Sequence, residues 1–502
     1  MVFKNNKFIK LVYWILLLLF VSIIILTNTF DIENPSFVSS DSSINLKFSR
    51  IYSSSGELAY KISSCDPKGI FLRPTYGTTF FNGTVVPEKF VGFMIFIGFI
   101  ISTIGENIVP YLNLMFFIFI LIILYKINNE YYDKKNSFKL LIFIASFSPL
   151  IYFTQYDFLE NIIAPFLFLL VILCVLKFRS NKNNILLIPI FVLTSYSMTI
   201  RPDLLLFYFP LFYFLKTEMF HFPRTLIFSI FLAILFISPL FIINNTLYGS
   251  PFTFGLTTPA EDGSLRNPTP GFIDFPLSNF PLNLGVIVGS ELLVLFAILS
   301  YRPAYNKRDI FLEKYFVITF ILCSLFYLTG PITRNLVNPI DNSYVRYFLP
   351  LLSLSIPIGL FWSKIIIKKR LLLIVIFGIF IVFSLLTLSI GLSDFRRLDN
   401  LYSEYSKGII NNTESNSIII TGIFSKSIYT ERETLTLSRA IDPDYQQTSN
   451  QVICLMAQNR SLYVFNKGDL NQNILKDSLS KYNLSIKDTN ITDLYKIVKL
   501  NF

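Results

Sequence analysis

The sequence predicts a polytopic α-helical membrane protein that ends in a small water-soluble α/β domain. Of its 502 residues, 53% are hydrophobic and 15% are charged, and the mean hydropathy is +0.57. A soluble core of this chain length has no room for so much apolar surface, so a lipid bilayer is the expected solvent. The apolar residues form long runs between short polar stretches, the pattern of repeated spanning helices. From residue 392 onward the composition is mixed, which indicates the soluble domain.

Charge and rare residue types exclude several classes of function. The formal net charge is +11, but the basic residues fall in short clusters between apolar runs, as topology signals do, so we expect no nucleic-acid partner. The single histidine, His221, excludes a histidine-based metal centre or a Ser-His triad. Four cysteines are too few for a disulfide framework. Cys174 and Cys323 lie in apolar runs, whereas Cys65 and Cys454 lie in polar segments, where they could pair.

Two apolar runs determine the predicted topology. The run 8–29 follows Lys4, Lys7 and Lys10 and lacks a cleavage site, so we expect an uncleaved signal anchor with a cytoplasmic N-terminus. If the run 89–104 crossed the membrane, every later basic cluster would lie opposite the N-terminus, against the positive-inside rule. This second run is also short for a full crossing. We therefore predict that 89–104 is an interfacial or re-entrant helix on the outer side.

This assignment leaves eleven crossings of the cell membrane. Besides 8–29, they are expected at 108–126, 139–155, 160–177, 184–200, 203–219, 225–243, 283–300, 310–329, 346–363 and 371–391. They form a transmembrane domain over 1–391, with the first outer loop and its interfacial helix at 30–107. Residues 392–502 form an extracytoplasmic domain. Its elements are expected to be strands at 418–424, 461–465, 484–487 and 494–500 and a helix at 469–482.

Ionisable side chains at the outer face are the candidate functional residues, because hydrocarbon makes a charge costly. The predicted topology brings the following to that face: Asp41 in the first outer loop, Lys89 at the interfacial helix, Asp157 and Glu160 after the third crossing, Arg201 after the fifth, and Arg346 at the tenth. Cations hold a lipid-linked phosphate, while a carboxylate activates an acceptor hydroxyl or holds a divalent metal. Two plainer interpretations stay open: Arg201 pairs locally with Asp203, and Arg346 is an interfacial anchor.

Five stretches, in order along the chain, resemble the GT-C-fold glycosyltransferases. They are Asp41 to Gly56, with an acid fifteen positions before a glycine; Pro87-Glu88-Lys89 before an apolar helix that ends at Gly105; Tyr156-Asp157-Phe158-Leu159-Glu160; the segment from Asn245 through Tyr248-Gly249-Ser250-Pro251 to Gly255; and Arg346-Tyr347-Phe348-Leu349-Pro350. The resemblance is to enzymes such as protein mannosyltransferases and aminoarabinose transferases. It implies a polytopic membrane enzyme that takes a sugar from a polyprenyl-phosphate donor and has a C-terminal outer domain.

The resemblance also implies roles for single residues. Asp41 is the expected catalytic base, with Asp31 and Glu33 as rivals nearer the membrane. Glu160 or Asp157 is the second acid, and the spacing to the next helix favours Glu160. The expected contacts of the donor phosphate are Arg346, Lys89 and Arg201. Many relatives have two adjacent acids in the first loop, whereas this chain has Ser42 after Asp41. That difference leaves a metal site there open.

The predicted activity is therefore transfer of a sugar to a lipid, glycan or protein acceptor on the outer face. A metal, if bound by Asp41 and Glu160, is expected to be Mg²⁺ or Mn²⁺, because the ligands are carboxylates. The alternative function is a membrane transporter or lipid-linked glycan flippase, for which Glu291 inside 283–300 is the candidate residue. A non-catalytic assembly protein of the cell envelope is the third hypothesis.

Overall fold

A computed structural model describes most of the chain. The described residues are 40–66, 72, 78–88, 90–132, 148–155, 160–251, 284–285, 287, 293–300, 310–327, 343–366, 370–421, 425–436, 445–466, 472–489 and 493–499. The predicted first crossing, 8–29, lies outside them. So do the residues Asp31, Glu33, Lys89, Asp157 and Glu291.

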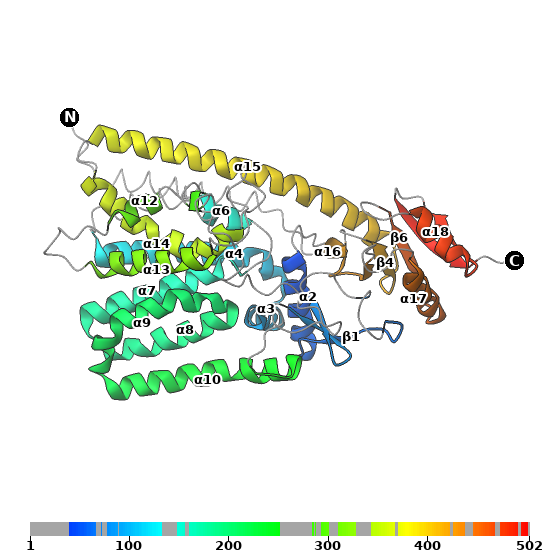
Figure 1. Ribbon diagram of the computed structural model, residues 1–502, viewed down its shortest axis with the longest axis horizontal. Coiled ribbons are helices and arrows are strands. Elements are labelled where there is room, and N and C mark those ends of the chain that lie inside the picture. The colour runs from blue at the N-terminus through cyan, green and yellow to red at the C-terminus, as the bar shows by residue number, and fades with distance from the viewer. Residues whose placement is uncertain are drawn as a thin grey trace.

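Helices make up the membrane part of the molecule (Figure 1). They are α2 Ser40–Ser55, α3 Val91–Ile104, η1 Glu106–Ile108, α4 Val109–Tyr131, α6 Ser148–Gln155, α7 Ile163–Asn181, η2 Asn184–Leu186, α8 Leu187–Ile200, η3 Pro202–Leu204, α9 Leu205–Phe220, α10 Pro223–Tyr248, α12 Leu293–Ile298, α13 Phe311–Tyr327, α14 Ser343–Ile366 and α15 Arg370–Asn411. Within the described residues, four segments are long and apolar enough to cross a membrane: Glu106–Tyr131, Ile163–Asn181, Pro223–Tyr248 and Val345–Ser363. The chain is thus a helical membrane protein, and the number of eleven crossings stays a prediction.

Two equally apolar helices have opposite surroundings in this bundle. In α7, Phe168, Val171 and Val175 are fully buried, as expected of a helix that is apolar on all sides and enclosed by others. In α10, Ile227 and Phe231 are 68% and 60% exposed, and the helix forms the edge of a row with α7, α8 and α9 (Figure 1). An exposed apolar face of this length is what a lipid-facing helix presents.

Helix α3, which covers most of the predicted interfacial run, lies across the others. In Figure 1 it is seen end-on, whereas α7 to α10 run across the view. Two glycines allow it to pack closely against α8 and α2. A Cβ atom at Gly92 would lie 2.4 Å from the backbone oxygen of Thr199, and one at Gly98 would lie 2.7 Å from the ring of Tyr52. Helix α3 is therefore wedged between α2 and the end of α8.

A small sheet that the sequence analysis did not predict follows α2. Its strands are β1 Tyr60–Lys61, β2 Thr78–Phe81 and β3 Thr84–Pro87, in the antiparallel order β1-β3-β2. Asn82 and Gly83 join β2 to β3, both with positive φ, as a tight two-residue hairpin requires. The Tyr248 hydroxyl donates a hydrogen bond of 2.6 Å to the Pro87 carbonyl. This bond ties the sheet to the end of α10.

The C-terminal part is an α/β unit around a five-stranded sheet. Its elements are β4 Ile418–Thr421, α16 Ser425–Ile428, β5 Glu433–Thr436, α17 Gln446–Ala457, β6 Leu462–Phe465, α18 Gln472–Ser480, β7 Leu484–Asp488 and β8 Leu494–Lys499, with strand order β5-β4-β6-β8-β7. The structure confirms all four strands and the helix predicted here. It adds β5 and α17, which are rich in polar residues and therefore carry a weak hydrophobic pattern.

Helix α15 joins the membrane part to this unit. The predicted last crossing, 371–391, lies within it, but the helix runs on to Asn411. Beyond the apolar run, Phe395, Tyr402 and Ile409 are buried and follow the buried Leu388 at intervals of seven residues. This spacing keeps one face of the helix packed. The helix therefore continues after its hydrophobicity has fallen.

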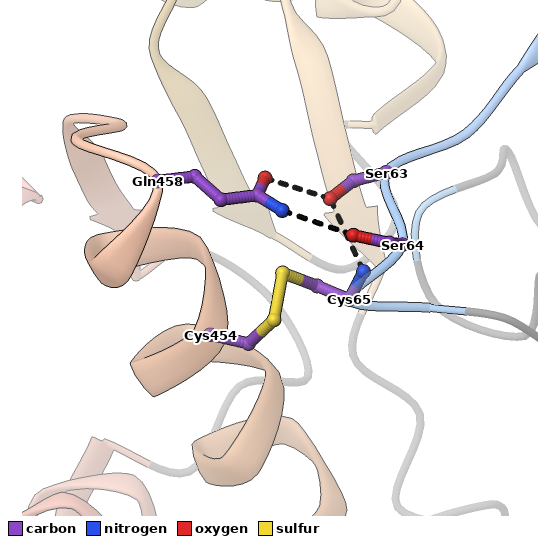
Figure 2. Close-up of a disulfide and its surroundings, with 5 residues drawn as sticks. All are labelled: Ser63, Ser64, Cys65, Cys454 and Gln458. Carbon is purple, nitrogen blue, oxygen red and sulfur yellow. Dashed lines mark hydrogen bonds between the residues drawn. A yellow bond between two sulfur atoms is a disulfide. The ribbon is translucent and has the colours of Figure 1, made fainter.

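A disulfide links the first loop to the C-terminal unit. Cys65 and Cys454 are bonded, with their Cα atoms 5.6 Å apart, while Cys174 and Cys323 are free thiols. Beside the disulfide, the Gln458 side chain accepts from the Ser63 hydroxyl at 2.9 Å and donates to the Ser64 hydroxyl at 3.1 Å (Figure 2). The two cysteines of polar segments therefore pair, across 389 residues of sequence.

Candidate active site

Helix α2, which contains position 41, contacts Glu160. Position 41 belongs to the first turn of α2, one turn before Asn45. Asn45 is 2% exposed, and its Nδ2 donates a hydrogen bond of 3.4 Å to Oε2 of Glu160. Leu46, the next residue of α2, belongs to the same buried cluster as Ile163 at the start of α7. Two segments that are more than a hundred residues apart in the sequence thus form one junction, hereafter the α2/α7 junction.

Arg201 lies in the turn between α8 and η3, in extended backbone. Its side chain is 3% exposed. The Nε atom donates to Oδ1 of Asp203 at 3.1 Å, Nη2 pairs with the other carboxylate oxygen, and Nη1 donates to the Arg346 carbonyl at 3.2 Å. The local ion pair with Asp203 is therefore present. The same guanidinium also reaches the backbone of α14, where Arg346 lies.

Opposing effects act on the charge of Arg201. Burial alone would lower the pKa of the guanidinium, but Asp203, Tyr327 and Glu160 together raise the pKa above its ordinary value. Arg201 is therefore a permanent cation. Ile200, directly before Arg201, belongs to the same buried cluster as Leu46 and Ile163, so the Arg201 turn packs beside the α2/α7 junction.

Two tyrosines complete the surroundings of the arginines. The guanidinium carbons of Arg201 and Arg346 are each 5.1 Å from the ring centroid of Tyr347. The ring of Tyr327 stacks on that of Tyr347 at 5.2 Å, and its hydroxyl donates to Oδ2 of Asp203 at 2.7 Å. Nη2 of Arg346 donates to the Tyr347 hydroxyl at 3.2 Å. Two cations therefore lie near one aromatic ring, as cation–π contacts allow.

The structure brings three of the predicted site residues into one region. Arg201 bonds the backbone of Arg346, and Ile200 beside Arg201 packs in one cluster with Ile163, three residues after Glu160. Lys89, Asp157 and the side chain of Asp41 lie outside the described part of the chain. Asn45, Tyr327 and Tyr347 were given no role from the sequence. Tyr347 lies in the stretch that opens with Arg346, which was the one signal for it. Asn45 and Tyr327 are uncharged and lie within helices, so no sequence pattern distinguishes them.

This region has the groups needed for transfer of a lipid-linked sugar. A carboxylate polarises or deprotonates a hydroxyl, and guanidinium groups stabilise a phosphate that gains charge as it leaves. Over the described residues, no group of three or more His, Cys, Asp or Glu side chains could hold a metal ion. Glu160 instead accepts a hydrogen bond from the side-chain amide of Asn45.

Comparison with known proteins identifies the fold. No protein-family model matches the chain, and no curated protein is significantly similar to it in sequence. Among solved structures, ArnT from Cupriavidus metallidurans in the apo state matches with a TM-score of 0.60 at 9% identity, over 97% of each chain. ArnT from the same organism bound to undecaprenyl phosphate matches with a TM-score of 0.58 at 9% identity, over 96% of this chain and 97% of that one. The chain therefore has the GT-C fold over nearly its whole length, as its five motifs predicted.

Proposed function

We propose that this protein is a membrane glycosyltransferase that transfers a sugar from a polyprenyl-phosphate donor to a lipid, glycan or protein acceptor on the outer face. One observation carries the proposal: within a GT-C fold, the α2/α7 junction with its carboxylate packs beside the turn of Arg201, which bonds the backbone of Arg346. The solved ArnT complex with undecaprenyl phosphate supports a lipid phosphate as the group that these arginines face.

In the proposed reaction, Asp41 takes the proton of the acceptor hydroxyl. The acceptor oxygen then forms a bond to the anomeric carbon of the sugar, while the bond from that carbon to the phosphate oxygen breaks. The electron pair of the broken bond leaves with the polyprenyl phosphate, whose negative charge Arg346 and Lys89 stabilise. Glu160 or Asp157 is the second acid.

We assign Arg201 an indirect role in this reaction. Three of its five N–H groups bond Asp203 and the Arg346 carbonyl. Its side chain is also 3% exposed, so a donor phosphate has little access to the two N–H groups that remain. Arg201 therefore acts by holding the first turns of α14, so that Arg346 and Tyr347 keep their positions.

The proposed topology places the N-terminus in the cytoplasm and both α2 and residues 392–502 outside. The disulfide between Cys65 and Cys454 supports a common compartment for these parts, because disulfides persist in oxidising surroundings. The orientation of α3, across the bundle helices (Figure 1), supports its assignment to the membrane interface. With α3 at the interface, 1–391 and 392–502 are the transmembrane and outer domains.

Asp41 and Glu160 are also the candidate ligands of a Mg²⁺ or Mn²⁺ ion, since hard cations prefer carboxylate oxygens. We propose to test this with the purified protein in EDTA. Transfer that stops in EDTA and returns with Mg²⁺ or Mn²⁺ assigns a metal to the reaction. Transfer that is unchanged in EDTA excludes it.

The proposal is tested in liposomes that contain the purified protein and a labelled undecaprenyl-phosphate sugar. Asp41→Asn should abolish sugar transfer, because an amide accepts no proton, and should leave membrane insertion intact. Wild-type activity in this variant would contradict the role of Asp41. Movement of the intact donor across the bilayer, without transfer, would instead identify a flippase.

A further inference from the structure

We propose that Asn161, together with Ser42, binds a hydroxyl group of the sugar that the donor carries. This inference rests on the proposed glycosyltransferase function and names the residues that recognise its substrate. Asn161 is 2% exposed and Ser42 is fully buried. Within the described part of the chain, neither Nδ2 of Asn161 nor Oγ of Ser42 has a hydrogen-bond partner.

Both side chains belong to the α2/α7 junction. Asn161 follows Glu160 directly, in the turn that leads into α7. Ser42 lies three residues before Asn45 on α2, and residues three apart share one face of a helix. Asn45 is itself the residue that donates to Glu160. The two unbonded groups therefore belong to residues that lie next to, or one helical turn from, the pair Asn45 and Glu160.

An unbonded buried amide destabilises a folded protein, because it has lost its bonds to water and gained none in return. Native proteins contain few such groups, and each requires an explanation. Rules of stable packing are broken mainly at functional sites. Other described side chains, such as that of Thr194, also bury an unbonded hydroxyl, so it is the position of Asn161 beside Glu160 that points to the substrate. We infer that the substrate supplies the partner here.

The chemistry of the junction identifies that partner as a sugar hydroxyl. A phosphate is unsuited to it, since the Glu160 carboxylate repels an anion and the arginines that suit a phosphate surround Tyr347 instead. A hydroxyl both donates and accepts. It can donate to the carboxylate of Glu160 and accept from the amide of Asn161 or the hydroxyl of Ser42.

A first measurement separates substrate recognition from a structural role. Asn161→Ala should leave the thermal unfolding temperature of the unliganded protein unchanged or raise it, because the amide makes no bond in that state. Asn184→Ala is the matched control, since Nδ2 of Asn184 donates to the Thr225 hydroxyl at 3.1 Å, away from this junction. This control should unfold at a lower temperature. A lower unfolding temperature for Asn161→Ala would mark a structural asparagine and overturn the inference.

A second measurement uses undecaprenyl-phosphate sugars that each lack one ring hydroxyl. For the wild-type protein, removal of the recognised hydroxyl should lower kcat/KM by about 100-fold or more, because the buried amide then stays unbonded. In Asn161→Ala, the complete and the deoxy donor should be used at similar rates, within about threefold. Asn161→Ser, which keeps a short polar side chain, should retain part of the discrimination, and Asn184→Ala should retain all of it.

The outcomes distinguish this inference from the proposed function. If the missing hydroxyl lowers kcat/KM for sugar transfer equally in the wild type and in Asn161→Ala, the inference is overturned and the proposed function stands. No transfer from any donor by the wild-type protein overturns both. If the missing hydroxyl lowers kcat/KM in the wild type but not in Asn161→Ala, the inference and the proposed function are both supported.

Discussion

Asn45 holds Glu160 through an uncharged amide, at a position where a carboxylate would repel it. The choice matters because two carboxylates within hydrogen-bond distance do not both ionise at neutral pH. An amide at position 45 instead donates a hydrogen bond to Glu160. The residue next to position 41 is likewise uncharged, since it is Ser42. The described side chains of the α2/α7 junction thus include one carboxylate and several neutral polar groups.

Asn45→Asp should lower the rate of sugar transfer at neutral pH. The new carboxylate would lie within hydrogen-bond distance of the Glu160 carboxylate and repel it, so the bond between α2 and Glu160 would be lost. Asn45→Ser, which adds no charge, is the control and should retain more of the activity. A wild-type rate in Asn45→Asp would show that the pairing of Asn45 with Glu160 is not needed for transfer.

The sequence pointed to the charged residues of the candidate site and to none of the uncharged ones. Glu160, Arg201 and Arg346 could be picked out from the sequence, because a charged residue at the end of an apolar run stands out. Asn45 and Tyr327 became visible only through their contacts in the fold, since polar residues within helices are common and carry no pattern of their own. The local pairing of Arg201 with Asp203 was foreseen as an alternative, but its bond to the Arg346 carbonyl joins residues that are 145 positions apart.

At the scale of elements, α2 is held in place by α3 on one side and by the C-terminal unit on the other. Arg50 of α2 bonds Glu106 of η1 at 2.6 Å and Glu431, after α16, at 2.5 Å. The hydroxyls of Tyr60 and Tyr429 are hydrogen-bonded to each other. These contacts fix the helix that contains position 41. The C-terminal unit therefore contributes to the candidate site through α2.

Arg50→Met should destabilise the protein by about 1–3 kcal/mol, because it leaves two partly buried carboxylates without their cation. Thermal unfolding of the purified protein measures this effect. Arg50→Lys should rescue it only in part, since one ammonium does not bond both glutamates as the guanidinium fork does. The double variant Arg50→Met with Glu431→Gln should lose less stability than the sum of the losses in the two single variants. Strict additivity would contradict the proposed coupling.

Gly92→Ala tests the wedged position of α3. The added Cβ would lie 2.4 Å from the backbone oxygen of Thr199, which is unable to move aside as a side chain would. We expect a loss of stability of about 1–3 kcal/mol together with reduced transfer. Gly408→Ala in α15 is the matched control, because nothing lies within 4 Å of its added Cβ. That control should stabilise the helix by up to about 1 kcal/mol. Equal unfolding temperatures for the two variants would contradict the tight packing of α3.

At the scale of the whole molecule, more of the C-terminal unit than of the membrane bundle could be predicted from the sequence. Strands β4, β6, β7 and β8 each have a local pattern of apolar residues bounded by polar ones, so each strand can be recognised from its own sequence. In the membrane part, lipid tails and neighbouring helices are equally apolar solvents. The buried α7 and the exposed α10 therefore have similar sequences, and only the fold separates them. The end of α15 was missed for a related reason, since its buried face continues after the apolar run stops.

The disulfide should hold the C-terminal unit against the first loop in the folded protein. Cys65→Ser with Cys454→Ser should increase the rate of proteolysis between the two units, because only non-covalent contacts, such as the ion pair of Arg50 with Glu431, then hold them together at this interface. Limited proteolysis with mass spectrometry measures this, and a reducing agent should have the same effect on the wild type. Combining the change with Arg50→Met should increase cleavage further. Cleavage rates equal to the wild type in the triple variant would show that neither contact secures the unit.

The fate of a labelled sugar on undecaprenyl phosphate tests the central claim most directly. Purified protein is incubated in liposomes with this donor and with extracted membrane lipids as acceptors, and the label and the free undecaprenyl phosphate are both quantified. We predict that label leaves the donor and that free undecaprenyl phosphate appears in equal amount, with Arg346→Met reducing both. Label that stays on the lipid phosphate with every donor and acceptor offered, or that crosses the bilayer on an intact donor, would contradict a glycosyltransferase.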